Sequence, residues 1–203
     1  FLRGVCFTDA NNGTAVGYSG TILRTTNGGT AWMAQASGTT LALRGVSFTG
    51  ANTGTVVGYN GTILRTENGG ATWIPQTSGT SGHLLGVSFS DADHGTVVGN
   101  NGTILRTIDG GETWTHQQSG TTADLRSVCF ADAFNGMAVG DYLAGSNIQG
   151  VILNTTNGGA TWSVQLDGST ENLYGVSLND ANTGTVVGYG GTILRTTTGG
   201  VIT

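Results

Sequence analysis

The sequence contains no lysine, a single proline and two cysteines, and only 9% of its 203 residues are charged. Its net charge of −5 argues against a nucleic-acid partner, because a phosphate backbone requires a basic surface. No apolar run approaches the roughly 20 residues that a membrane-spanning helix needs, so membrane insertion is excluded as well. The two cysteines say little about the redox compartment.

Glycine is what the sequence has in abundance, with 37 copies among many threonines and asparagines. This composition disfavours helices and favours short strands joined by tight turns. The glycines follow a repeat, because a segment beginning Leu-Arg-Gly-Val at Leu2 returns in related form at Leu43, Leu84, Leu125 and Leu173. The hexapeptide Gly-Thr-Ile-Leu-Arg-Thr is identical in four copies. We therefore divide the chain into five units: 2–42, 43–83, 84–124, 125–172 and 173–203.

Each unit is predicted to form four short strands, which we name A to D. In the second unit, strand A covers 43–48, strand B covers 54–59, strand C covers 62–66, and strand D begins at Trp73. A two-residue hairpin turn with positive φ is expected between B and C, at Asn60 and Gly61. A repeat of about 41 residues with four strands is typical of a β-propeller blade.

The predicted fold is therefore an all-β propeller of about five four-stranded blades in a single domain. The fifth unit has only 31 residues, so its blade is expected to lack the outer strand. Either the ring closes with a three-stranded blade, or the chain is a piece of a longer propeller.

The turn between strands C and D, called the C–D turn below, has the sequence Thr-Glu-Asn-Gly-Gly-Ala-Thr-Trp at 66–73 and related forms at 25–32, 107–114 and 155–162. It resembles the Asp-box, or bacterial neuraminidase repeat, and most closely the version found in the photosystem II assembly-factor family of propellers. We interpret its side chains as structural, with Asn or Asp capping backbone N–H groups and Trp anchoring the turn. These positions are Asn27, Asn68, Asp109, Asn157, Trp32, Trp73, Trp114 and Trp162.

All seven arginines occupy only two positions of the repeat, one in strand A and one at the end of strand C. We predict that the strand C arginines Arg24, Arg106 and Arg195 pair with aspartates of the A–B turns, with backbone carbonyls at the turn as another fitting partner. Those aspartates are Asp9, Asp91, Asp132 and Asp180. The resemblance implies the competing role, a binding face for an acidic partner formed by Arg24, Arg65, Arg106 and Arg195.

Breaks in the repeat are where a unique function is expected. Seven extra residues in the fourth unit replace its B–C turn, and we predict there a longer loop that offers Tyr142, Leu143 and Ile148 for binding. A second break is Tyr174, which stands where other units have Arg or Leu. Neutral drift of a loop would explain the same insertion, since loop length costs little stability.

Catalysis is not indicated, because the tyrosines and arginines are periodic and no pair of acids is marked out, whereas a glycoside hydrolase needs one singular site. The three histidines, His83, His94 and His116, fall in different parts of the repeat and do not suggest a metal site. No cofactor is expected. Cys6 and Cys129 share one strand A position and are interpreted as buried thiols, although a bridge between them is conceivable.

The sequence thus predicts a non-catalytic binding or scaffold propeller for protein partners, like the photosystem II assembly factors. One alternative is a multivalent glycan-binding propeller that uses Tyr18, Tyr59 and Tyr189 at the B–C turns. A second alternative is a sialidase-like hydrolase. Composition and resemblance favour a bacterial protein outside the cytoplasm, either secreted, periplasmic or on the cell surface.

Overall fold

The computed structural model describes residues 1–145, 147–165 and 171–197, and these form nineteen strands and three short 3-10 turns. The first sheet contains β1 (Leu2–Phe7), β2 (Gly13–Gly17), β3 (Ile22–Thr25) and β4 (Met33–Gln35). The second contains β5 (Leu43–Phe48), β6 (Gly54–Gly58), η1 (Tyr59–Gly61), β7 (Ile63–Thr66) and β8 (Ile74–Gln76). The third contains β9 (Leu84–Phe89), β10 (Gly95–Gly99), η2 (Asn100–Gly102), β11 (Ile104–Thr107) and β12 (Thr115–Gln117).

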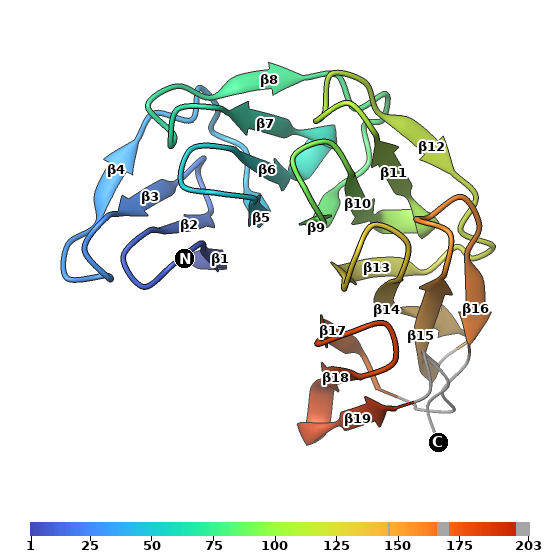
Figure 1. The fold of residues 1–203 in the computed structure, drawn as a ribbon. Helices are drawn as coiled ribbons and strands as arrows, with labels where there is room; N and C mark the ends of the chain where they lie inside the picture. Colours follow the sequence, from blue (N-terminus) through green and yellow to red (C-terminus); the bar gives the residue numbers. More distant parts are fainter. Residues whose placement is uncertain (146, 166–170, 198–203) are drawn as a thin grey trace. The chain divides into compact units, whose positions relative to one another are not determined.

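The fourth sheet contains β13 (Asp124–Phe130), β14 (Gly136–Ala144), β15 (Asn147–Thr155) and β16 (Ser163–Gln165). The fifth contains β17 (Leu173–Leu178), β18 (Gly184–Gly188), η3 (Tyr189–Gly191) and β19 (Ile193–Thr196). In every sheet the strands lie in chain order (Figure 1), and the paired strands are antiparallel. These sheets are the blades of a β-propeller, so the predicted fold class is confirmed. Within the described residues the fifth blade has three strands, as expected.

The chain divides into two compact units, Phe1–Gly95 with Thr107–Trp114 and Thr96–Arg106 with Thr115–Thr203. In the first unit, the packing of blade one on blade two buries Val16, Ile22 and Leu43 completely or almost so. In the second unit, blade four shares one core with Val98 and Ile104 and another with Leu173 of blade five. A four-stranded blade has two apolar faces, and these clusters bury them only by stacking one repeat on the next.

The B–C turn of the second blade has the predicted backbone conformation with positive φ. Asn60 has φ 53° and Gly61 has φ 69°, the left-handed values that the Asn-Gly pair supplies. Gly61 is also required by space, since a Cβ there would lie 2.0 Å from the carbonyl oxygen of Thr80.

Small side chains at one position of strand A link that strand to strand A of the next blade in three places. Ser47 Oγ accepts the backbone N–H of Phe89 at 3.2 Å, and Cys129 Sγ accepts that of Leu178 at 3.4 Å. Cys6 receives the N–H of Phe48 in the same way. Both cysteines are free thiols, and burial raises the pKa of each. Serine and cysteine both occur at this position because either one can accept that backbone hydrogen bond.

The seven-residue insertion of the fourth unit is strand, not the predicted loop. β14 and β15 continue their pairing outward through Tyr142↔Gln149 and Leu143↔Ile148 to Ala144↔Asn147. Gly145, with φ 66°, follows β14 at the tip. The insertion extends an existing antiparallel ladder because aromatic and aliphatic residues on both sides suit cross-strand pairing. The prediction missed this because it interpreted the seven extra residues as a longer loop in place of the B–C turn.

Candidate functional site: an arginine–tyrosine cluster

The strand C arginines lie between blades. Arg24 is only 8% exposed, and its Nη2 donates to the backbone carbonyl of Ala51 in the next blade at 2.7 Å. Its Nη1 donates to Thr14 Oγ1 at 3.0 Å, and the guanidinium lies 5.1 Å from the centroid of the Phe48 ring. Burial lowers the pKa of Arg24. The contacts with Ala51 and Phe48 belong to the packing of blade one on blade two, whereas the bond to Thr14 lies within blade one.

The other three strand C arginines differ from Arg24 in their neighbours and in their exposure. Arg65 lies over the Phe89 ring at 5.6 Å and approaches Glu67 at 3.8 Å. Arg106 is half-buried beside Gly158, and desolvation lowers its pKa. Arg195 of the last blade is exposed. These four residues therefore do not form one common exposed face within the part of the chain that is described.

The predicted pairing of these arginines with A–B turn aspartates is wrong. Among the described residues, no carboxylate lies within 4 Å of Arg24, Arg106 or Arg195. For Arg24, the partner is the alternative that the sequence suggested, a backbone carbonyl at the turn. The physical reason is that the aspartates already cap their own turns.

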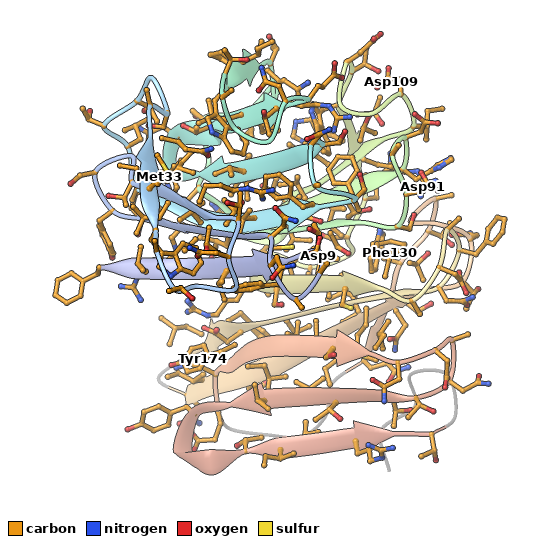
Figure 2. The ribbon with its side chains drawn as sticks, turned by 60° about the vertical axis from the view of Figure 1, so that its left-hand side comes forward. Asp9, Met33, Asp91, Asp109, Phe130 and Tyr174 are labelled. Carbon is orange, nitrogen blue, oxygen red and sulfur yellow. The ribbon has the colours of Figure 1, made fainter. Side chains whose placement is uncertain are left out.

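Asp9 shows how these carboxylates are used, since its Oδ1 accepts the backbone N–H groups of Asn11 and Asn12 at 2.7 and 2.9 Å. Asp91, Asp132 and Asp180 each accept two backbone N–H groups in the same way. Hydrogen bonds from their own turns lower the pKa of Asp9, Asp132 and Asp180. In Figure 2, Asp9 and Asp91 are labelled on the loops that follow β1 and β9.

The C–D turns are held by one Thr and one Asn or Asp each. In the second copy, Asn68 Oδ1 accepts the N–H of Thr72 at 2.9 Å, and Thr66 Oγ1 accepts the N–H of Gly70 at 2.9 Å. Asn27, Asp109 and Asn157 make the equivalent bonds to residues 31, 113 and 161. The turn tryptophans pack edge-on against the phenylalanine that ends strand A, with centroids 6.0 to 6.1 Å apart.

The tryptophans differ in how far they are covered. Trp73 and Trp162 are 8% and 9% exposed, whereas Trp32 of the first blade is 37% exposed and Trp114 is half-buried. Trp73 Nε1 donates to Gln35 Oε1 of the preceding blade at 3.3 Å, and Trp114 does the same to Gln76. These side chains thus join neighbouring blades at their outer edge.

Two other positions of the repeat, an arginine in strand A and a tyrosine after strand B, lie together in the first unit. Arg3, in strand A, donates from Nη2 to the hydroxyl of Tyr18 at 2.8 Å, and its guanidinium lies 5.0 Å from that ring. Arg44 lies over the Tyr59 ring at 5.7 Å. The hydrogen bond from Arg3 lowers the pKa of Tyr18, and Arg44 and the Tyr59 hydroxyl act in the same direction. The two arginine–tyrosine pairs are therefore close enough for one pair to affect the pKa of the other.

His83 completes this cluster. Its ring stacks on Tyr59 with centroids 4.0 Å apart and 8° between the planes. Its Nδ1 accepts the backbone N–H of Asn60 at 3.3 Å, so the neutral ring carries its proton on Nε2. The Tyr59 ring thus has both a guanidinium and an imidazole as neighbours.

We call Arg3, Tyr18, Arg44, Tyr59 and His83 the arginine–tyrosine cluster. Within the described residues, no carboxylate approaches Arg3 or Arg44 within 4 Å. Two guanidinium groups without a carboxylate partner, next to phenol hydroxyls and an imidazole N–H, offer an array of donors to an anionic group.

The sequence carried a signal for this cluster that our prediction did not use. Arg and Tyr stand 15 residues apart in the first two units, and the third unit has lost both, with Leu85 and Asn100 at those positions. In the fourth unit, Asp141 replaces the tyrosine and forms an ion pair with Arg126. Arg126 also lies 5.5 Å from the Tyr174 ring. Among the described residues, strand A arginines without a carboxylate partner therefore occur in blades one and two.

The residues predicted from the breaks in the repeat lie in the second unit. Tyr142 is half-buried and donates its hydroxyl to Gln149 Oε1 at 2.6 Å. Leu143 is 72% exposed and Ile148 is partly covered. Tyr174, labelled in Figure 2 near the start of β17, is 47% exposed. Tyr174 lies against the guanidinium of Arg126, which forms its ion pair with Asp141.

Metal binding finds no support in the described residues, where no group of three His, Cys, Asp or Glu side chains is placed to hold an ion. Nor does the described part of the chain include a helix with the length and apolar character to cross a membrane.

Comparison with known proteins places these features in context. The sequence model of a family described as photosynthesis system II assembly factor YCF48 matches residues 1–77 and again residues 76–169. No curated protein sequence matches the chain significantly.

Several solved structures share the fold. YCF48 bound to a D1 peptide is 18% identical with a TM-score of 0.52, and the alignment covers 97% of this chain and 93% of that one. YCF48 from Cyanidioschyzon merolae is 22% identical with a TM-score of 0.72, over 97% of this chain and 67% of that one. An ancestral GH74 enzyme is 15% identical with a TM-score of 0.71, and only 29% of its chain is covered. At these identities the likeness concerns the fold alone.

Proposed function

The chain belongs to the photosynthesis system II assembly factor YCF48 family, and from this premise we propose that it is a non-catalytic propeller that binds an acidic segment of a protein. The observation that carries the proposal is the arginine–tyrosine cluster, where the guanidinium groups of Arg3 and Arg44 have aromatic neighbours and no carboxylate partner among the described residues. A structure of YCF48 bound to a D1 peptide supports a protein segment as the class of ligand.

The chemistry of the cluster favours an anionic ligand. Arginine presents planar N–H groups that match a carboxylate. A tyrosine ring next to the guanidinium attracts it through a cation–π interaction. The whole protein carries a net charge of −5, so the attraction is local to this cluster and is screened beyond about 10 Å at 0.1 M salt. Binding is therefore expected to depend on where acidic residues lie in the ligand, and not on its total charge alone.

Absence of catalysis is part of the proposal. A glycoside hydrolase requires a carboxylic acid whose pKa is raised so that it can donate a proton. Here the carboxyl groups of Asp9, Asp91, Asp109, Asp132 and Asp180 all have lowered pKa values because they accept hydrogen bonds from their turns.

Peptide arrays test the class of partner. Peptides of equal length and hydrophobicity that carry Asp and Glu are expected to bind, whereas the same peptides with Asn and Gln are not. Equal binding of both sets would contradict an acidic partner, and turnover of a chromogenic glycoside by the purified protein would contradict the absence of catalysis.

We also propose that the protein works outside the cytoplasm of a bacterium. The absence of lysine and the turn-rich composition favour this, and fractionation of the native source tests it. Recovery of the protein with cytoplasmic markers would contradict it.

A further inference from the structure

A polar cleft of about 570 Å³ lies in the second unit, far along the chain from the arginine–tyrosine cluster. Strand D of blade three and the segment that follows it form one wall, which includes Gln117, Gln118 and Thr122. Asn101 of the B–C turn and Tyr142 of the extended β14–β15 hairpin also line it. Its volume falls within the range of about 300–1,000 Å³ that is usual for small-molecule sites.

Three features distinguish this cleft from the equivalent regions of blades one and two. Gln118 is exposed and stands where blades one and two have Ala36 and Thr77. The hairpin that carries Tyr142 exists only in blade four, because other B–C turns are short. Tyr142 is held in place by its hydrogen bond to Gln149.

Gln117 supplies the third feature. The equivalent Gln35 and Gln76 bond the indole N–H of the next blade's tryptophan at 3.3 Å. Gln117 instead donates from Nε2 to Thr115 in its own strand at 3.3 Å, and the indole nitrogen of Trp162 is buried without a hydrogen-bond partner. An amide that fastens blades together elsewhere therefore faces the cleft here.

The lining carries no charge at neutral pH. Asn101, Gln117 and Gln118 offer amide donors and acceptors, Thr122 a hydroxyl, and Tyr142 an aromatic ring. The nearby carboxylates are occupied, since Asp124 accepts the backbone N–H of Asn101 and Asp141 pairs with Arg126. None of the residues that line the cleft supplies a counter-charge for an ionic ligand.

We propose that this cleft binds a neutral carbohydrate. Planar amides form paired hydrogen bonds with neighbouring hydroxyl groups, and the face of a tyrosine packs against the C–H face of a sugar ring. The site is single, unlike the repeated B–C turn tyrosines, and it is independent of the arginine–tyrosine cluster. An uncharged peptide is the ligand that the same polar groups would take if the proposal fails.

The test is a glycan array of neutral oligosaccharides, followed by calorimetric titration of the best ligand. Wild type is expected to bind at least one oligosaccharide class with a Kd below about 1 mM. Gln118→Ala and Tyr142→Ala should each weaken binding at least tenfold, and Tyr142→Phe should retain most of it. Thr77→Ala, the equivalent of Gln118 in blade two, is the matched control and should leave the affinity unchanged.

The readouts separate failure of this proposal from failure of the proposed function. Arg44→Gln should leave the sugar affinity unchanged. Because Gln118 is exposed, its variant keeps the test valid even if Tyr142→Ala disturbs the hairpin. The proposal is overturned if no neutral oligosaccharide binds, if binding is insensitive to Gln118, or if an uncharged Gln/Ser/Gly peptide binds there in place of the sugars.

Discussion

The guanidinium of Arg24 donates from Nη2 to the backbone carbonyl of Ala51 at 2.7 Å, and so joins the strand C end of blade one to the A–B turn of blade two. The two residues are 27 positions apart in the chain and lie in different repeats. A carbonyl at a turn has no strand partner, and the planar guanidinium can satisfy it while resting on the Phe48 ring. The repeated arginine is therefore a device for stacking blades.

Replacing Arg24 by Gln is expected to lower the free energy of unfolding by about 1–3 kcal/mol, because the charge-assisted bond from the buried guanidinium to the Ala51 carbonyl is lost. Arg195→Gln is the matched control, since Arg195 holds the same repeat position but is exposed. Its effect should stay within about 0.5 kcal/mol. Urea denaturation of both variants measures the difference, and equal losses would contradict the role of the Ala51 contact.

The outer edge of the blades offers a second comparison. Gln35→Ala removes the hydrogen bond that Gln35 accepts from Trp73 Nε1 and the one that it donates to the carbonyl of Gly69. The free energy of unfolding should fall by about 1–2 kcal/mol. Gln117→Ala at the equivalent position should cost less, because Gln117 bonds only within its own strand among the described contacts. Thermal unfolding of the two variants checks this order, and the reverse order would count against it.

Acid stability should depend on Asp109. Hydrogen bonds from Thr113 lower its pKa from 3.8 to about 2. A depressed carboxyl pKa contributes stability above the unfolded value of 3.8, and this contribution is lost as the pH falls toward about 2. Asp109→Asn places there the residue that the other complete C–D turns use and should remove that part of the pH dependence.

The measurement for Asp109 is the urea midpoint of wild type and variant between pH 5 and 2. The advantage of wild type over the variant should shrink steadily across this range. A constant difference at every pH would mean that the Asp109 carboxylate has no special stabilisation in the folded protein.

The sequence predicted the fold closely because the repeat shows the same pattern five times. Strands 43–48, 54–58, 63–66 and 74–76 lie within one residue of the predicted bounds, since glycine and asparagine mark each turn. The extended hairpin of blade four was missed because it occurs once, and a single copy offers no comparison.

The partners of side chains were harder to predict than the strands. Asp9 was assigned to an arginine because opposite charges were expected on the same face, but its carboxylate instead accepts the nearby backbone N–H groups of Asn11 and Asn12. The pairing of Arg3 with Tyr18 was readable from the common 15-residue spacing in the first two units. In the fourth unit the same spacing places Asp141 beside Arg126, so the strand A arginine there has a carboxylate partner.

The affinity of one acidic peptide for the double variant Arg3→Gln/Arg44→Gln tests the central claim most directly. Loss of two charge-assisted contacts is expected to raise the Kd at least tenfold, with an unchanged unfolding midpoint and a weaker dependence on salt. Arg195→Gln, which removes an exposed arginine elsewhere, should leave the Kd unchanged. Unaltered binding by the double variant, or an equal loss with Arg195→Gln, would contradict the assignment of the arginine–tyrosine cluster as the protein-binding site.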